Sequence, residues 1–406
     1  MQDPTDPALA LRREFLLRPG VVFLNHGSYG ASPRPVFDAY QEWQRELEGQ
    51  PVEFLGRRLR GLLEASRAAL GAYVGADGDD LVYVPNSTFA LNVVARALPL
   101  SPGDEVLGTD HEYGAIERTW RFVCGRRGAR YVRQAVPLRP SSPGEVVEAI
   151  WAGVTPRTRV LFLSHITSPT ATVFPIEPLL RRARAAGILS VVDGAHAPGQ
   201  LPLDLEALGA DFYAGNCHKW LCAPKGSAFL HARREVQELL SPLVVSWGWQ
   251  SDRPGPSRFV DEQQLQGTRD PAAFLAVPAA IRFLEQHDWP AVRRRCHDLL
   301  AGARRAIGAL TGLPPLTPDT PDWYAQMAAF PLPPCDGPAL KERLYRSYQI
   351  EVPVTSWRGL AFVRVSVQGY TSAADVATLV GALADLLPEV TAGVGAAGVP
   401  TVPGPR

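Results

Sequence analysis

The chain has 406 residues, of which 46% are hydrophobic and 20% are charged, so it can bury a large core and is not disordered as a whole. Its 41 basic and 41 acidic side chains balance, which leaves no net field to attract nucleic acid or an anionic membrane. The N-terminus lacks the basic flank and apolar core of a signal peptide and no stretch approaches a membrane span, so we expect a cytoplasmic protein without a membrane anchor.

The scarcity of lysine and the number and spacing of the cysteines are both informative. The basic residues comprise 38 arginines and only three lysines, Lys219, Lys225 and Lys341. Arginine stays protonated, whereas a desolvated lysine can lose its proton and attack a carbonyl carbon, so a lysine retained against this bias is a candidate for a chemical role. The five cysteines are an odd number without paired CxxC units, which predicts reduced thiols and neither a disulfide framework nor a metal site.

Short apolar runs alternate with helical patterns through the first two thirds of the chain. The predicted strands are 80–84, 104–110, 129–136, 159–165, 188–193, 211–216 and 227–232, and the predicted helices between them are 89–98, 115–128, 144–154 and 176–187. This alternation predicts an α/β fold with a mainly parallel mixed sheet flanked by helices. Ligands bind such sheets at the carboxyl ends of the strands, so the residues after each strand are the first candidates for a site.

The pattern changes after the turn-rich stretch 251–259. Helical patterns follow at 271–287 and 291–310, strand patterns at 325–332 and 360–368, and a last helical pattern at 372–387. We therefore predict an N-terminal segment (1–20), a large α/β domain (21–255), a smaller α+β domain (256–390) and a flexible Gly/Pro-rich tail (391–406).

Lys219 is the lysine whose surroundings best suit chemistry. It follows the predicted strand 211–216 and is flanked by His218 and Trp220, a partly apolar setting that favours a neutral, nucleophilic amine. The alternative is an exposed lysine on a loop. Lys225 lies only six residues on, in a Pro-Lys-Gly turn that is typical of structure or solvent contact.

Asp193 ends the apolar strand 188–193 and opens the turn DGAHAPG. A carboxylate at this place is costly to desolvate unless it is paired, so it usually holds a cation or a protonated nitrogen, such as that of a pyridine ring. His196, three residues on, could reach the same ligand. A purely structural role, in which Asp193 caps the following turn, is equally compatible with the sequence.

The stretch PNSTFALN (85–92) predicts a strand, a turn and the start of a helix. Ser87 and Thr88 would stand at the helix N-terminus, where free backbone N–H groups and the positive end of the dipole suit a phosphate. On this stretch alone, an ordinary N-cap is the simpler interpretation. The chain has neither GxGxxG after a first strand nor GxxxxGK[ST]. The sequence therefore gives little support for a binding site for a nicotinamide cofactor or a nucleoside triphosphate.

An arginine lies in the middle of the predicted strand 360–368. Because strand residues alternate, Arg364 shares its face with Phe362 and Ser366. It is either solvated on an open face or aimed at an anion, and its fork geometry matches a carboxylate.

Together these features resemble a pyridoxal-phosphate enzyme of the aspartate-aminotransferase fold (fold type I), and more closely the class V aminotransferase family in its isopenicillin N epimerase-like branch. The GNCHKW (215–220) and DGAHAPGQ (193–200) stretches are specific for this branch. The resemblance runs from 24 to about 385 and is also carried by LNHGSYGASPRPV (24–36), PNSTFALNVV (85–94), TDHEYGAIERTW (109–120), SHITSPTATVFPI (164–176), GTRDPAAFLAVPAAIRFL (267–284) and VRVSVQGYTSAADV (363–376).

The resemblance implies the central roles by position. Lys219 would form the internal aldimine with pyridoxal 5'-phosphate and later move the substrate α-proton. Asp193 would pair with the pyridinium nitrogen, which keeps the ring an electron sink. His196 would lie near the ring or its phenolic oxygen.

It also implies a set of residues around the phosphate. Ser87 and Thr88 would bind it by backbone and hydroxyl groups, with help from Asn216 and His218. Thr268 in GTRD would reach the phosphate across the interface of a homodimer.

Further residues would contact the ring and the substrate. Tyr113 or His111 would stack on the ring, with Tyr113 preferred, and Ser168 would also contact the cofactor. Arg364 matches the arginine that binds the substrate α-carboxylate, and Asn25 would line the substrate entrance.

The implied function is that of a homodimeric enzyme that acts at the α-carbon of a small amino-acid substrate through an external aldimine and a quinonoid carbanion. An epimerase of the isopenicillin N type or a class V aminotransferase matches best. A C–S lyase, of the cysteine desulfhydrase or sulfoxide-lyase type, is the alternative, and a non-catalytic cofactor-binding relative is a different class. Cysteine desulfurases need a nucleophilic cysteine shortly before the carboxylate-binding arginine, but 352–364 contains none, so we do not expect that chemistry.

Overall fold

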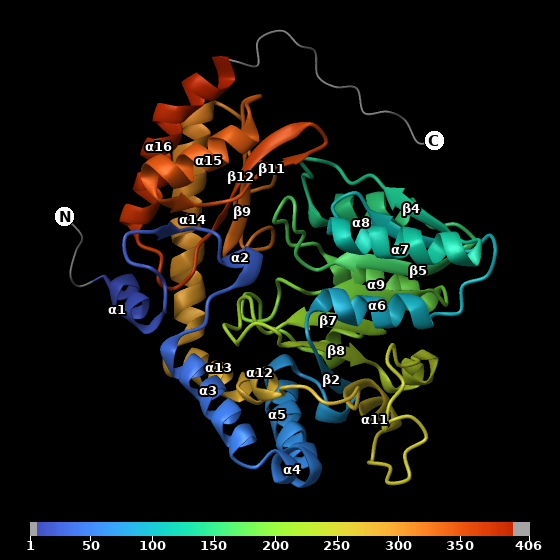
Figure 1. The fold of residues 1–406 in the computed structure, drawn as a ribbon. Helices are drawn as coiled ribbons and strands as arrows, with labels where there is room; N and C mark the ends of the chain where they lie inside the picture. Colours follow the sequence, from blue (N-terminus) through green and yellow to red (C-terminus); the bar gives the residue numbers. More distant parts are fainter. Residues whose placement is uncertain (1–5, 393–406) are drawn as a thin grey trace. The chain divides into compact units, whose positions relative to one another are not determined.

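The computed structural model describes residues 6–392, and the chain forms two compact units (Figure 1). The larger unit comprises Ser28–Ser168 and Val173–Trp289. The smaller unit comprises the chain up to Gly27, the short stretch Pro169–Thr172 and the chain from Pro290 onward. Almost all of the predicted tail (391–406) lies outside the described residues.

The larger unit carries the predicted strands and helices together with further helices that the sequence pattern did not predict. In chain order they are α3 (Arg34–Gly49), α4 (Pro51–Glu53), η1 (Phe54–Arg58), α5 (Leu59–Val74), η2 (Gly78–Asp80), β2 (Leu81–Val84), α6 (Ser87–Ala97), β3 (Glu105–Thr109), α7 (Gly114–Arg127), β4 (Arg130–Gln134), α8 (Pro143–Trp151), β5 (Thr158–Ser164), α9 (Ile176–Ala185), β6 (Leu189–Asp193), α10 (Leu205–Leu208), β7 (Phe212–Asn216), β8 (Ala228–Ala232), η3 (Arg234–Leu239), α11 (Arg258–Gln264), α12 (Ala272–Leu275) and α13 (Val277–Gln286).

Seven strands of this unit form one sheet in the order β2-β8-β7-β6-β5-β3-β4 (Figure 1). Strand β8 runs antiparallel to both of its neighbours, and the other pairs are parallel. The predicted fold class is thereby confirmed. The strands β3, β5, β6 and β7 lie side by side and point the same way, so their carboxyl ends meet at one edge of the sheet.

Helix packing explains why these strands read as continuous apolar runs. Every residue of β2, β3, β7 and β8 is buried, as expected for strands covered on both faces. Helices α6 and α7 contact each other and the sheet, and the ring of Trp120 in α7 lies 5.9 Å from that of Phe162 in β5. Burying such side chains contributes about 1.5–3 kcal/mol each, so this layer fixes the edge at which the candidate residues stand.

The smaller unit combines two short sheets with long helices. The two-residue strand β1 (Val22–Phe23) pairs in parallel with β10 (Ile350–Glu351), and β12 (Leu360–Ser366) pairs antiparallel with both β11 (Val354–Trp357) and β9 (Met327–Leu332). Among residues 6–392, no helix is long and apolar enough to cross a membrane. The helices are α1 (Pro7–Glu14), α14 (Trp289–Thr311), α15 (Gly337–Tyr348) and α16 (Ala373–Ala392). The first residue of α14 belongs to the larger unit, and α2 (His26–Tyr29) is divided between the two units.

The domain boundary and the helix over 271–287 both differ from the sequence prediction. The units divide at 289/290, whereas the sequence pattern placed the boundary at 255/256, because α12 and α13 pack on α3 and α5 of the larger unit. The helix predicted over 271–287 is two helices, α12 and α13. Pro278 stands in the first turn of α13, where its missing N–H costs nothing, and it could not continue the hydrogen bonds of α12.

Candidate active site at the carboxyl edge of the sheet

The turn after β7 presents the candidate lysine to a histidine from the turn after β6. Lys219 is half-buried, and its Nζ lies 3.2 Å from Nε2 of His196. The indole N–H of Trp220 donates to Nδ1 of His196 at 3.3 Å. Because an indole can only donate, Nδ1 is the acceptor and the neutral imidazole carries its proton on Nε2, facing the amine. Lys219 is therefore held against His196 and is not an exposed lysine on a loop.

Two glycines allow the backbone to pack tightly around this turn. Gly30, in the LNHGSYG stretch, has φ +70°, and a Cβ there would lie 1.9 Å from the backbone oxygen of His218. Gly199 has φ +87°, and a Cβ there would lie 2.2 Å from the backbone oxygen of Trp220. Only glycine combines this backbone conformation with such close approach, so both positions hold Lys219 in place.

Asp193 stands at the end of β6 and is 5% exposed. Burial raises the pKa of its carboxyl group, because the charged form loses its hydration. Its Oδ1 accepts a hydrogen bond from the backbone N–H of Ala195 at 3.0 Å, so the predicted turn cap is also present. This bond and the positive charge of Lys219 lower the pKa but do not cancel the effect of burial, so a protonated nitrogen of a ligand beside Asp193 would favour its charged form further.

The start of α6 offers the groups expected for a phosphate. Asn86 is the N-cap, since its Oδ1 accepts the N–H of Phe89 at 2.8 Å, so the ordinary N-cap interpretation of Ser87 and Thr88 is wrong. The N–H of Ser87 donates to Oδ1 of Asn216, at the end of β7, at 2.9 Å. The Ser87 hydroxyl is buried without a hydrogen-bond partner among residues 6–392, which is the kind of group that a bound anion satisfies.

His218 lies two residues after β7, and burial favours its neutral form. Burial lowers the pKa of its imidazole to about 4, and Nδ1 bonds to the backbone oxygen of Ser227 at 3.0 Å. With the proton on Nδ1, Nε2 is an acceptor. His218 therefore donates to a phosphate only when it is protonated, a state that an adjacent dianion favours.

Tyr113 and His111 differ in how open they are. Tyr113 is the N-cap residue of α7 and its side chain is 47% exposed. His111 is buried, with Nε2 3.8 Å from Oδ1 of Asp110 and its ring 5.4 Å from that of Phe174. A ring that stacks on an enclosed ligand can itself be buried, so exposure does not decide between the two, and Tyr113 stays a prediction.

The remaining candidates divide between the two units. In the larger unit Ser168 is half-buried and Thr268 is exposed. In the smaller unit Nδ2 of Asn25 donates to Oε1 of Glu351 at 2.9 Å, and Arg364 is 7% exposed in the middle of β12. The alternative of a solvated Arg364 on an open face is therefore wrong.

Glu112 belongs to the same edge, although the sequence did not single it out. It is buried and forms hydrogen bonds with the hydroxyls of Thr109 (2.6 Å) and Ser164 (2.5 Å), at the ends of β3 and β5. Burial raises the pKa of Glu112 to about 8 against these bonds, and the charge of Asp193 adds to the rise. The sequence does not show that Glu112 is buried with a raised pKa, because its burial is caused by segments that lie far away in the chain.

Glu112 should make stability depend on pH. Between its ordinary pKa and about 8, the folded chain keeps a proton that the unfolded chain has released, so stability falls as the pH rises through this window. Glu112→Gln keeps the shape without the ionisation and should flatten this fall. Thermal unfolding of both proteins from about pH 5 to about pH 9 measures it. An unchanged slope in the variant would show that another group titrates.

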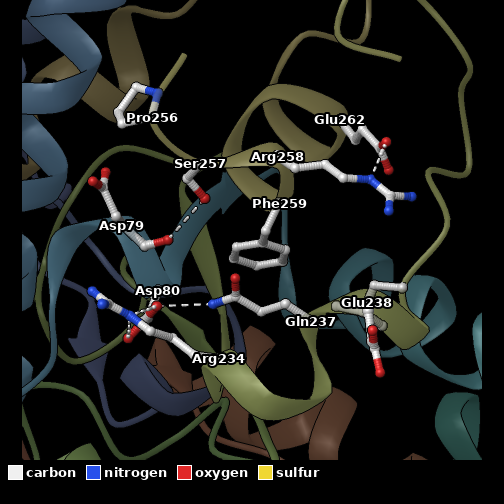
Figure 2. A pocket seen from close by; sticks show the side chains of 11 residues that line it. Asp79, Asp80, Arg234, Gln237, Glu238, Pro256, Ser257, Arg258, Phe259 and Glu262 are labelled. Atoms are coloured by element: carbon white, nitrogen blue, oxygen red, sulfur yellow. Dashed lines mark hydrogen bonds and ion pairs between the residues drawn. The ribbon is translucent and has the colours of Figure 1, made fainter. Parts of the chain in front are cut away.

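A separate hollow of about 420 Å³ lies at the opposite edge of the sheet (Figure 2). Strand β8 is antiparallel to β7, so its last residue, Ala232, stands where β7 begins. The two arginines of this hollow already have acidic partners, because Arg234 donates to Asp80 at 3.1 Å and Arg258 to Glu262 at 2.7 Å. Because its arginines are already paired, we do not favour this hollow over the carboxyl edge as the candidate site.

Known proteins resemble the chain over nearly its whole length. A family model described as Aminotransferase class-V matches residues 22–379. The chain is 40% identical to the isopenicillin N epimerase of Amycolatopsis lactamdurans, covering 92% of this chain and 97% of the relative. It is 37% identical to that of Streptomyces clavuligerus, with 93% and 98% covered, and 32% identical to a putative L-cysteine desulfhydrase of rice, with 82% and 74% covered.

Solved structures share the fold at lower identity. The cysteine desulfurase CsdA of Escherichia coli has a TM-score of 0.79 and 24% identity, covering 96% of this chain and 100% of its own. A C-DES mutant with glycine covalently linked to its PLP cofactor has a TM-score of 0.80 and 22% identity, with 92% and 99% covered.

Proposed function

Because the chain belongs to the aminotransferase class-V family, we propose that it is an amino-acid epimerase that acts at the α-carbon with pyridoxal 5'-phosphate as cofactor. Membership of this cofactor-dependent family indicates an enzyme, and the assignment of an epimerase reaction is our proposal. Two epimerases at 40% and 37% identity over nearly full length support that choice. The observation that carries the proposal is the pairing of Lys219 with His196 at the edge that also holds Asp193.

The residues present fit this cofactor. Lys219 would hold its aldehyde carbon covalently through Nζ, Asp193 would pair with the ring nitrogen, and the Ser87 hydroxyl would bind the phosphate together with Thr88. Asn216 orients the Ser87 backbone through its side-chain oxygen. When bound, the cofactor withdraws electrons from the substrate α-carbon, which makes the α-proton acidic enough to be removed.

Proton transfer at the α-carbon is assigned to Lys219. Its amine, free again once the substrate amine has taken its place on the cofactor, is the base that removes the α-proton. His196 would orient the freed amine, because its Nε2 lies 3.2 Å from Nζ and Trp220 fixes the ring. Tyr113, Ser168 and Thr268 are further residues that we propose to contact the cofactor.

We also propose that the enzyme is a homodimer. The segment between η3 and α11 exposes four large apolar side chains, more than solvent contact explains. Thr268, which the family pattern assigns to a partner's phosphate, is exposed as that role requires. The four side chains are those of Val244, Val245, Trp247 and Trp249.

Arg364 should set the affinity for the substrate carboxylate. A charge-assisted pair of bonds contributes about 1.5–3 kcal/mol, so Arg364→Ala should raise KM about 10- to 100-fold with a smaller change in kcat. Arg364→Lys keeps the positive charge but loses the two parallel N–H donors of the guanidinium, and should give an intermediate KM. Steady-state kinetics measure both, and a KM unchanged by either substitution would remove Arg364 from the substrate site.

A parallel screen of D- and L-amino acids tests the reaction. An epimerase incorporates deuterium from solvent at the α-carbon and interconverts the two forms without releasing keto acid or sulfide. A 32% identical relative named as a cysteine desulfhydrase makes a C–S lyase the second candidate, which sulfide release from cysteine would reveal. Keto-acid formation would instead show an aminotransferase.

A further inference from the structure

A buried hydrogen-bond network in the smaller unit joins the LNHG stretch to the end of β12. The N–H of Leu24 donates to the backbone oxygen of Glu351 at 3.0 Å, and the N–H of Ser366 donates to that of Leu24 at 2.9 Å. The N–H of Gly27 donates to the Ser366 hydroxyl at 3.2 Å. Residues 24–27 are thus tied to β12 at both of their ends.

His26 stands inside this loop, is fully buried and bonds at both ring nitrogens. Nδ1 lies 2.9 Å from the hydroxyl of Tyr370, and Nε2 lies 3.1 Å from Nε2 of Gln368. The amide orientation of Gln368 is fixed, because its Oε1 accepts the N–H of Gly369 at 2.7 Å and the side chain of Gln326 at 3.2 Å.

This arrangement determines the proton on His26. The Gln368 amide donates to Nε2, so the neutral ring carries its proton on Nδ1 and donates it to the oxygen of Tyr370. The Tyr370 ring is itself held, with its centroid 4.8 Å from that of Phe15 in an edge-on contact. A buried hydrogen-bond network of this kind selects one geometry, whereas apolar packing alone would tolerate small shifts.

The two residues proposed for the substrate flank this network. Asn25 immediately precedes His26, and Arg364 lies two residues before Ser366 on the same face of β12. We propose that Tyr370 is a positioning residue, which acts through His26 to fix the spacing of Asn25 and Arg364 for a carboxylate-bearing substrate. The inference rests on the proposed function, since it assigns both residues to the substrate.

Tyr370→Phe removes one hydroxyl and leaves the aromatic packing in place. Loss of one neutral hydrogen bond should raise KM about 3- to 10-fold while kcat stays within about twofold. The visible absorption of the bound cofactor should not change, because its ligands lie in the larger unit.

Tyr324→Phe is the matched control. Tyr324 is in the same unit, is equally buried and bonds through its hydroxyl to Asp319, away from residues 24–27. It should lower the melting temperature as Tyr370→Phe does but leave KM unchanged.

The outcomes separate the inference from the function on which it rests. Equal KM for wild type and Tyr370→Phe, or the same KM shift in Tyr324→Phe, would overturn the positioning role while the enzyme remains active. Wild-type protein that shows neither α-proton exchange nor an amino-acid-dependent change in cofactor absorption would overturn the proposed function and the inference with it. Thermal unfolding of each variant shows whether it is folded, so that lost binding is not mistaken for lost structure.

Discussion

Lys219→Ala should abolish α-proton exchange and remove the visible absorption of the lysine-bound cofactor. The substitution removes both the amine that holds the cofactor covalently and the base that moves the proton. A positioned base alone contributes about 10²- to 10⁴-fold to a rate, so loss of both functions should leave no measurable turnover. Exchange is followed by loss of the α-proton signal in deuterated water, and the cofactor by its absorption spectrum.

Lys225→Ala is the control for this variant. It removes another of the three lysines, six residues away, and should leave both colour and exchange intact. A Lys219→Ala protein that keeps its absorption band, or a Lys225→Ala protein that loses it, would assign the covalent bond to the wrong lysine.

Asp193→Ala should lower cofactor affinity and turnover by a combined factor of about 150 to 5,000. Removing one partner of a buried ion pair costs about 3–5 kcal/mol, here because the ring nitrogen would be left without its counter-charge. Asp193→Glu keeps the charge and should retain more activity than Asp193→Asn, which keeps the shape. Titration of the apoprotein with pyridoxal phosphate and kinetics at saturating cofactor separate the two effects.

In the absence of cofactor, Asp193→Asn should not destabilise the protein. Burial raises the pKa of Asp193, which means that its charged form is strained in the empty fold. Apoprotein carrying Asp193→Asn should therefore melt at the same or a higher temperature than wild type. A marked loss of apoprotein stability with unchanged cofactor binding would make Asp193 a structural residue.

The sheet was predictable because its strands are short, apolar and bounded by turns. Burial on both faces gives β5 and β6 a continuous apolar sequence, and each strand lies within a few residues of its prediction. Helix α3 was missed although Val36, Tyr40, Trp43 and Leu47 have helical spacing. Strand β1 could not be predicted, because two residues are too few to show an alternating pattern and its partner β10 lies more than 300 residues away.

The candidate site was predictable where a residue type is unusual for its place. A rare lysine after a strand and an aspartate at the end of an apolar strand can both be recognised from the sequence alone. The bond between Lys219 and His196, the Trp220 contact that sets its proton and the raised pKa of Glu112 depend on segments that meet only in the fold. The Asn86 cap was missed because Asn, Ser and Thr are all good N-caps, and sequence alone does not rank neighbours among them.

Solvent deuterium exchange at the α-carbon of an amino acid is the measurement that tests the central claim most directly. Wild-type enzyme with pyridoxal phosphate should incorporate deuterium and convert a single enantiomer into a mixture of both, without release of keto acid or sulfide, and Lys219→Ala should do neither. Exchange that continues in Lys219→Ala, or wild-type deuterium incorporation with complete retention of configuration, would contradict it.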